Sequence, residues 1–410
     1  MNLKEYKILL NIVFSGIWAQ LVMIIASVVF ARLYSPAAFG TLAYVSGFAS
    51  IIAIVSGLRF DYIVFSKKDK EKSLYNIISF LIMFVFHLVV VFMILGLDLI
   101  SDLISDRSYW LVFFSFSSSV FYLSTQLLIS IKEYSFFSKI RVFQAIFQLG
   151  TGLLFFYVSP DIGLILAYSI SQLLIGILVY YFNFNPFFNL KIKEIKDCFL
   201  ENFKNAFHNS VIVLIQYSTP FAPILIGEYL YHTNDVGAFF LLSSAICAPL
   251  AIFRRSLVNL FNGELTSPRK ARVLIGKTTN KLLILLGTLF LLVCGIVVIL
   301  IFSEEIVLLV FGKQWVVYSD FMLPLFVFFY LDMFFQPFTT LLPLWGRQNY
   351  SMFLESLRFG LVYVLLPLLA FWLSLSYFNV LIGYFFLSTS IYILTILKVF
   401  KYIIPPLKIN

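Results

Sequence analysis

Charged side chains are scarce in this sequence. Lys, Arg, Asp and Glu make up only 12% of its 410 residues, while hydrophobic residues make up 61% and the mean hydropathy is +0.98. Soluble domains contain about 25% charged residues. A soluble fold of this length would have too little polar surface to enclose so much apolar material. The composition therefore excludes an ordinary soluble protein and indicates an integral membrane protein.

Residues for metal sites and disulfides are also few. The three cysteines, Cys198, Cys247 and Cys294, lie far apart, and there are only three histidines. No pair of cysteines has the spacing of a metal motif or of a disulfide framework. We therefore predict no metal site and no disulfide.

The motifs of common soluble enzymes are missing. The sequence has no Walker loop, no H-E-x-x-H and no G-x-S-x-G. Without a P-loop the protein does not hydrolyse ATP by that route, so any transport draws on an ion gradient or on the substrate gradient. We predict that the protein is not an enzyme and that it uses no cofactor.

Long apolar runs, in contrast, are abundant. A helix needs about 20 mostly apolar residues to cross a bilayer. Twelve runs meet this requirement, which predicts an all-α integral membrane protein with about twelve transmembrane helices. The predicted spans are residues 8–31, 38–58, 73–97, 109–131, 141–158, 162–183, 207–228, 236–258, 279–302, 319–343, 351–373 and 377–400.

The basic residues predict the orientation of these spans. With the N-terminus inside, all but three of the 29 Lys and Arg residues fall on the cytoplasmic side, and the exceptions are Arg32, Arg107 and Lys313. This asymmetry is the positive-inside rule. We therefore expect both termini in the cytoplasm. The net charge of +9 is then a topology signal and an attraction to anionic membrane lipids, and it does not indicate nucleic-acid binding.

The two halves of the chain resemble each other. Residues 32–40 join the first two spans and residues 228–237 join the seventh and eighth, and aligning Gly40 with Gly237 also aligns Tyr34 with Tyr231. The repeat predicts an N-terminal six-helix bundle over 1–190 and a C-terminal one over 191–410. Two parallel bundles with a cavity between them suit alternating access, which favours transport.

Two ionisable residues lie deep in predicted spans. Asp332 is near the middle of span 319–343, and His87 is near the middle of span 73–97. Such residues are costly in a membrane and are candidates for function. We predict an ion-coupling role for both, with Asp332 as a proton or sodium site or a contact for a polar substrate, and His87 as a proton relay. The alternative for each is a structural group that is satisfied by a neighbouring helix.

Several arginines lie near the predicted cytoplasmic surface. Arg59, with Asp61 beside it, closes the second span, Arg254 and Arg255 close the eighth, and Arg358 lies in the eleventh. Guanidinium groups bind phosphate in a bidentate manner. These five residues are the candidate substrate-binding set. The alternative is that the arginines only anchor the helices by snorkelling to the interface.

Four segments resemble a known family. Residues Ala31–Gly40 are similar to the R-L-L-S-P-x-x-F-G segment of polysaccharide biosynthesis proteins, and Gly57–Asp69 are similar to that family's G-x-R-[YF]-[ED] segment. Residues Leu309–Trp315 resemble its F-G-x-x-W motif, and Trp345–Gln348 resemble its G-R-Q turn. The segments follow in the expected order over most of the chain.

These proteins are the O-antigen and oligosaccharide repeat-unit flippases, in the superfamily that includes multidrug exporters of the MATE type and lipid II flippases. The resemblance implies a V-shaped pair of six-helix bundles in a bacterial inner membrane. It also implies that undecaprenyl-diphosphate-linked oligosaccharide moves from the inner to the outer leaflet for O-antigen or capsular polysaccharide synthesis. A polysaccharide polymerase and a chain-length regulator are the protein partners that such a role implies.

Two other functions compete with this interpretation. A multidrug or cation exporter of the same superfamily usually has several carboxylates in its cavity, whereas only Asp332 is deep here. A polytopic O-antigen polymerase usually has a large outer loop with catalytic basic residues, whereas the predicted outer loops are short and hold three basic residues. Both alternatives are therefore less favoured.

Overall fold

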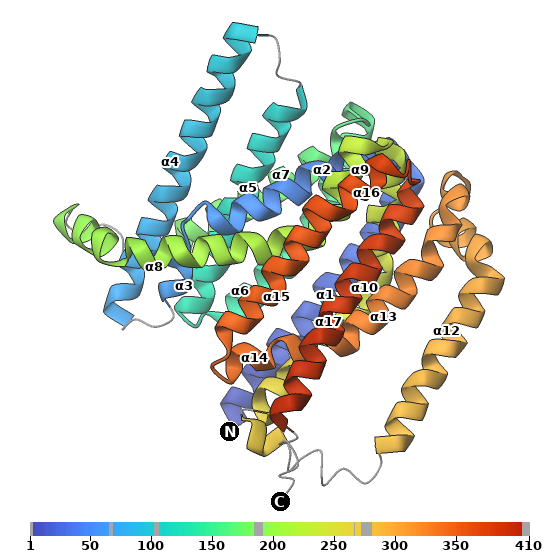
Figure 1. Cartoon of the computed structure of the whole chain (residues 1–410). Helices are drawn as coiled ribbons and strands as arrows, with labels where there is room; N and C mark the ends of the chain where they lie inside the picture. Colours follow the sequence, from blue (N-terminus) through green and yellow to red (C-terminus); the bar gives the residue numbers. More distant parts are fainter. Residues whose placement is uncertain are drawn as a thin grey trace, which may run out of the picture. The chain divides into compact units, whose positions relative to one another are not determined.

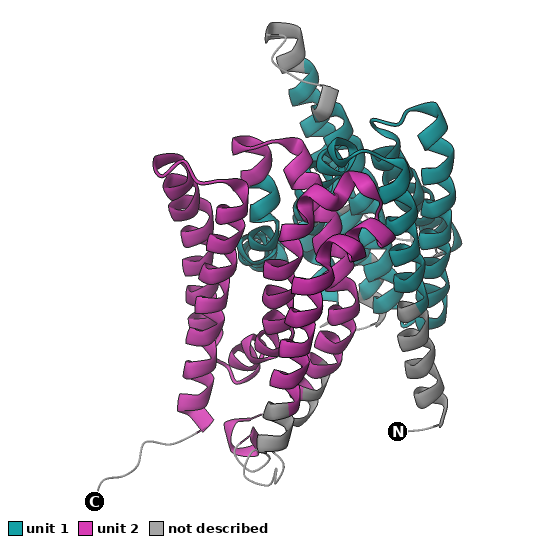
Figure 2. Ribbon diagram, turned by 90° about the vertical axis from the view of Figure 1, so that its right-hand side faces the viewer, with its two compact units in different colours: residues 1–225 teal, residues 226–410 magenta. Residues whose placement is uncertain are grey.

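The computed structural model describes residues 3–64, 69–101, 106–183, 192–265, 267–271 and 281–403, and every regular element in these ranges is a helix. The chain forms two compact units, residues 1–225 and 226–410 (Figure 2). Figure 1 shows the helices in chain order. The predicted division into two six-helix bundles at residue 190 stays a prediction.

Unit 1 consists of long apolar helices joined by short turns (Figure 1). The chain leaves this unit within its last helix, α9. The elements are α1 (Leu3–Leu33), α2 (Pro36–Val55), α3 (Phe60–Ile63), α4 (Asp69–Ser101), α5 (Asp106–Ser130), α6 (Tyr134–Val158), α7 (Gly163–Asn183), α8 (Ile192–Ser218), the 3-10 turn η3 (Thr219–Phe221) and α9 (Ala222–Leu230).

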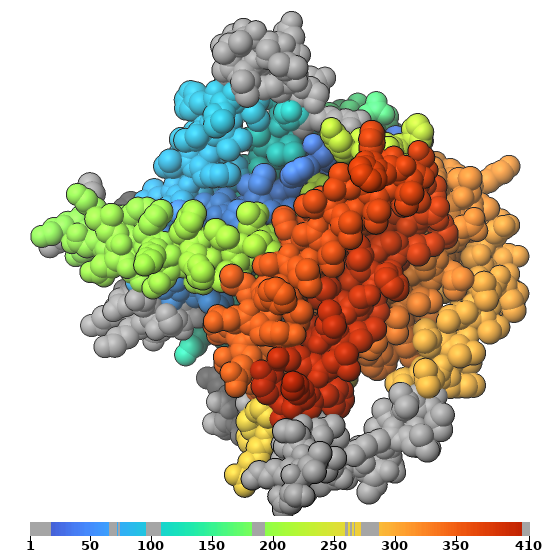
Figure 3. All heavy atoms as spheres, in the orientation of Figure 1, coloured from blue at the N-terminus to red at the C-terminus, as the bar shows by residue number. Residues whose placement is uncertain are grey.

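Unit 2 combines long helices with shorter helical segments. The helix α12 lies at the edge of this unit (Figure 3), and its large apolar side chains are mostly exposed. The elements are α10 (Thr233–Glu264), α12 (Lys281–Val310), η4 (Lys313–Phe321), α13 (Met322–Thr339), α14 (Leu341–Leu344), α15 (Gln348–Gly360), η5 (Leu361–Leu365), α16 (Leu366–Trp372) and α17 (Tyr377–Ile403).

The helices confirm the predicted fold class. Within the described residues, eleven helices are long and apolar enough to cross a membrane, and the shorter apolar stretch Trp18–Leu33 of α1 coincides with the first predicted span. Several spans are longer than predicted, among them the fifth and the seventh. The fifth begins at Tyr134 instead of residue 141, and the seventh covers Lys193–Leu230 instead of 207–228. Charged residues at the starts of these helices lower the hydropathy without ending the helix.

The two units repeat one packing pattern. In unit 1, α2 packs on α5, α5 packs on α7, and α6 packs on α7. In unit 2, α10 packs on α13, α13 packs on α17, and α15 and α16 pack on α17. Each unit thus pairs its second span with its fourth, its fourth with its sixth, and its fifth with its sixth. This pattern supports the parallel repeat that the sequence indicates.

A tyrosine makes an equivalent bond in each unit. Tyr34 follows α1, and its hydroxyl donates to the carbonyl of Gly152 on α6 at 2.7 Å. Tyr231 follows α9, and its hydroxyl donates to the carbonyl of Leu375 after α16, also at 2.7 Å. Burial raises the pKa of Tyr34 to about 12, so its phenol stays protonated and keeps donating. In each unit the tyrosine therefore ties the end of the first span to the fifth.

The eleventh span contains a π-helical segment, Leu361–Leu365. Pro367 follows it and has no backbone N–H to donate. A wider turn avoids the clash that the proline ring would make with the carbonyl four residues earlier. The π segment therefore lets α15 and α16 continue as one span.

Candidate functional site

The backbone makes a left-handed turn where the second span ends. α2 ends at Val55, and Leu58 and Arg59 follow with φ angles of 47° and 57°. This conformation costs an L-residue about 1–2 kcal/mol. The turn directs the short helix α3 and places Arg59 and Asp61 next to α5.

Arg59, Tyr122 and Asp61 form a buried polar cluster. The Nη1 atom of Arg59 donates to the Tyr122 hydroxyl at 2.6 Å, and this hydroxyl donates to Oδ2 of Asp61 at 2.9 Å. The same Arg59 nitrogen lies 3.4 Å from the carboxylate oxygen. The guanidinium also lies over the ring of Tyr62, 5.2 Å from its centre. The sequence indicated Arg59 and Asp61, but it gave no reason to single out Tyr122.

The cluster keeps both a donor and an acceptor for further use. Arg59 Nε and Asp61 Oδ1 are buried and have no hydrogen-bond partner among the described residues. Burial lowers the pKa of Arg59, but Asp61 and Tyr122 raise it more, so the guanidinium stays charged. Burial raises the pKa of Asp61, and the positive charge of Arg59 opposes this effect. An anion bound here would meet a permanent positive charge with an unused N–H.

A second cluster occupies the corresponding place in unit 2. Arg254 Nη1 on α10 donates to Oδ2 of Asp332 on α13 at 2.5 Å. The Asp332 side chain is buried and that of Arg254 is about one quarter exposed. Asp332 thus has an arginine partner that lies 78 positions away in the sequence. The neighbouring Arg255 is exposed.

The two clusters follow one plan. In each unit an arginine near the end of the second span bonds to a side chain of the fourth span, Tyr122 in unit 1 and Asp332 in unit 2. The carboxylate comes from the chain just after the arginine in unit 1 and from the fourth span in unit 2. The two units therefore share the position of a paired arginine, but they share no sequence motif around it.

Arg358 lies inside unit 2 instead of at its surface. It is 6% exposed, and its donors face Ser388 at 3.3 Å and Tyr384 at 3.5 Å on α17. Its guanidinium also lies over the ring of Tyr392, and Glu355 is 3.8 Å away. These contacts hold α15 against α17. A role for Arg358 in binding substrate stays a prediction.

His87 is buried in α4 among aromatic rings. Its Nδ1 lies 2.8 Å from the Met83 carbonyl one turn earlier, and its ring makes an edge contact with Phe116 on α5. The contacts of His87 in the described part of the chain include no carboxylate. A role in ion coupling stays a prediction for this residue.

Comparison with known families identifies the chain. The profile of the polysaccharide biosynthesis protein family matches residues 29–320, which is more than half of the sequence and includes Arg59, Asp61, Tyr122 and Arg254. Asp332 lies beyond the matched residues. The chain belongs to this family. A search of curated proteins finds no significant match.

Solved structures with the same fold are transporters. The lipid II flippase MurJ in its inward closed conformation has a TM-score of 0.68 at 13% identity, and the alignment covers 95% of the present chain and 87% of MurJ. The multidrug transporter DinF-BH has a TM-score of 0.62 at 13% identity, over 96% and 95% of the two chains. The eukaryotic MATE transporter AtDTX14 has a TM-score of 0.58 at 14% identity, over 97% and 96%. The chain therefore has the fold of these transporters.

Proposed function

We propose that this polysaccharide biosynthesis protein is a flippase. Its substrate is an oligosaccharide repeat unit on undecaprenyl diphosphate, which moves from the inner to the outer leaflet of the bacterial inner membrane. Both termini lie in the cytoplasm. A polysaccharide polymerase and a chain-length regulator then act on the product at the outer face.

The observation that carries this proposal is the paired arginine in each unit. Arg59 and Arg254 hold equivalent positions and both stay charged against a buried carboxylate. A diphosphate needs more than one cation, and arginine is the side chain best suited to it. Arg255 adds an exposed positive charge beside Arg254. We therefore propose that each cluster by itself can bind phosphate, in unit 1 through the N–H that Arg59 leaves unpaired and in unit 2 through Arg254 with Arg255 beside it.

Asp332 provides a link between substrate and ion. The diphosphate and the Asp332 carboxylate compete for the same guanidinium of Arg254. When the diphosphate binds Arg254, the carboxylate loses its partner in an apolar environment and takes up a proton or a sodium ion, because an unpaired buried charge is costly. Release of the substrate restores the ion pair and expels the ion. Substrate and ion therefore bind at this site together and leave it together.

The test is a translocation assay with the purified full chain in proteoliposomes. The liposomes carry a fluorescent oligosaccharide on undecaprenyl diphosphate, and an added glycosidase digests only the sugars that reach the outer face. We expect the protein to expose the sugar faster than protein-free liposomes do. The same sugar on undecaprenyl monophosphate should move more slowly, since it has fewer charges for the arginines.

The exporter alternative is measured in the same vesicles. A cationic dye replaces the lipid-linked sugar, and its accumulation is followed by fluorescence. Transport of the dye without movement of the lipid-linked sugar would contradict the proposal and favour a multidrug exporter.

A further inference from the structure

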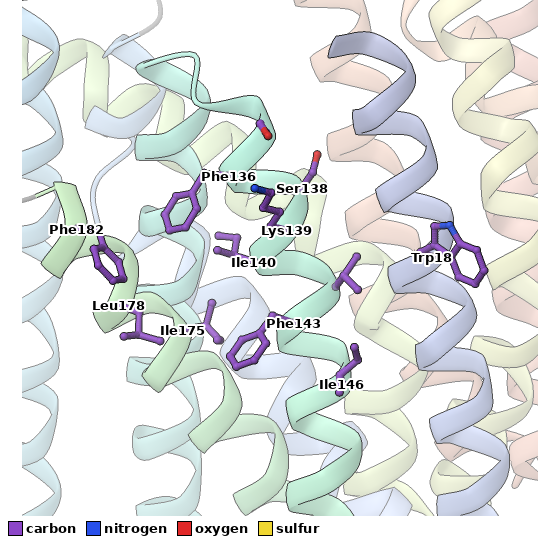
Figure 4. A pocket seen from close by; sticks show the side chains of 12 residues that line it. Trp18, Phe136, Ser138, Lys139, Ile140, Phe143, Ile146, Ile175, Leu178 and Phe182 are labelled. Carbon is purple, nitrogen blue, oxygen red and sulfur yellow. The ribbon is translucent and has the colours of Figure 1, made fainter. Parts of the chain in front are cut away.

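Unit 1 contains an apolar hollow that the arginine clusters do not use. It lies among α1, α6 and α7 and has a volume of about 740 Å³ (Figure 4). Trp18, Phe143, Ile146, Leu178 and Phe182 line most of it. Sites for small ligands have volumes of about 300–1,000 Å³. The hollow is therefore large enough to hold part of a lipid.

The hollow opens to the surroundings within membrane-spanning helices. Phe143, Ile146 and Phe182 line it and remain more than half exposed, although they lie in or next to the predicted spans 141–158 and 162–183. A side chain at this depth faces lipid when no protein covers it. A hydrocarbon chain can thus enter the hollow sideways from the bilayer.

One end of the hollow is polar. Ser138 and Lys139 lie near the start of α6 and line this end, as Figure 4 shows. Ser138 is only 5% exposed, and its hydroxyl has no hydrogen-bond partner among the described residues. A buried hydroxyl without a partner is costly, so the site lacks an acceptor. A phosphate oxygen accepts from a hydroxyl and from an ammonium group together.

Further positive charge lies around this end. Lys132, in the turn before α6, and Arg141, two residues after Lys139, are both exposed. The charge pattern predicts that this end of α6 faces the cytoplasm. The surroundings therefore match a headgroup with more than one negative charge in the inner leaflet.

We propose that the hollow holds the isoprenoid chain of a polyprenyl diphosphate, with its phosphate at Ser138 and Lys139. This inference rests on the proposed function and makes the hollow an entry site, which the substrate occupies before its diphosphate reaches the arginines. A polyprenyl diphosphate has one chain for its multiply charged head, which matches a single apolar hollow beside a cluster of cations. A membrane phospholipid has two chains and, in most cases, a single charge.

The test measures lipid binding to the purified full chain by native mass spectrometry. The probes are undecaprenyl diphosphate and, as competitor, phosphatidylglycerol. Ile146→Trp fills the hollow, and Leu154→Trp is its matched control because Leu154 lies on the same helix, is 60% exposed and does not line the hollow. Lys139→Gln removes the charge, and Lys196→Gln removes an exposed lysine of α8 as its control.

We expect Ile146→Trp and Lys139→Gln each to weaken undecaprenyl diphosphate binding by about tenfold. Lys139→Gln loses one charge-assisted contact with the phosphate, and Ile146→Trp loses apolar contacts with the isoprenoid chain. The two control variants should bind as the wild type does. Equal binding by Ile146→Trp and Leu154→Trp would overturn the proposal, and so would equal displacement by phosphatidylglycerol, which would mark a general lipid site. The translocation assay separates the proposed function from the lipid site in the hollow. If the wild-type protein flips the substrate while all four variants bind it equally, only the site in the hollow is refuted.

Discussion

Tyr122 shows how much depends on one hydroxyl group. It accepts a hydrogen bond from Arg59 and donates one to Asp61, so a side chain of α5 bridges the guanidinium and the carboxylate. Tyrosine is common in membrane helices as an interfacial residue, and its position in the sequence carries no sign of this contact. Asp332 was recognisable because a carboxylate at mid-depth is rare. Arg254 was a candidate for binding substrate, but its bond to Asp332 was not predictable, because sequence spacing does not show which helices pack together.

The first prediction concerns Arg59. Arg59→Ala should reduce translocation by roughly tenfold or more, because it removes a charge-assisted bond to phosphate that is worth about 1.5–3 kcal/mol. Arg59→Lys should retain more activity, since it keeps the charge but loses the bidentate geometry. The rates come from the glycosidase assay, with the amount of inserted protein measured in parallel. Normal rates in Arg59→Ala at normal insertion would leave this arginine with an anchoring role.

The second prediction concerns Asp332. Asp332→Asn keeps the shape of the side chain but removes its charge and its ability to bind a proton. We expect a correctly inserted variant whose translocation no longer responds to an imposed proton or sodium gradient, while exchange down a substrate gradient continues. His87→Gln serves for comparison, since it tests the other predicted coupling residue in the same vesicles. A gradient response that survives in Asp332→Asn would show that the carboxylate serves only to hold Arg254.

At the scale of the helices, small residues determine how closely two spans approach. A Cβ atom on Gly152 would lie 2.2 Å from the ring of Phe30, so α1 and α6 meet through a residue without a side chain. A Cβ atom on Gly150, two residues earlier on α6, would have no heavy atom within 4 Å outside the helix's own backbone. Small residues at such contacts are typical of membrane helices, which associate through close packing.

The third prediction uses this matched pair. Gly152→Ala should lower the free energy of unfolding by about 1–3 kcal/mol, because Phe30 is fully buried and has little room to move. Gly150→Ala should be neutral or stabilise the helix by up to about 1 kcal/mol. The measurement is the apparent melting temperature of each purified variant in detergent. Equal melting temperatures would show that α1 and α6 are less closely packed than described.

At the scale of the whole chain, hydropathy and charge predicted most of the architecture. A bilayer requires long apolar helices, so the spans stand out in the sequence with only small errors at their ends. The seventh span was placed too short because Lys193, Glu194, Lys196 and Asp197 occupy the start of α8. The bonds of Arg59 to Tyr122 and of Arg254 to Asp332 were not predictable in the same way, because each joins residues that are distant in sequence.

The fourth prediction concerns the topology. Single cysteines at Asp161 and Lys313 should react with an impermeant maleimide from outside, and those at Lys132 and Lys270 should react only after the membrane is opened. All four positions are exposed in the structure. The background protein has Cys198, Cys247 and Cys294 replaced by serine or alanine. Labelling of Lys270 from outside in intact cells would contradict the twelve-span topology.

At the left-handed turn of Leu58 and Arg59, a substitution that makes the protein more stable to heat would also slow transport. Glycine adopts this conformation without the steric cost, so Leu58→Gly would recover part of about 1–2 kcal/mol. The same change would loosen the backbone that directs Arg59 toward α5. Laboratory selection for heat resistance would therefore favour glycine at position 58, and selection for transport rate would retain the leucine.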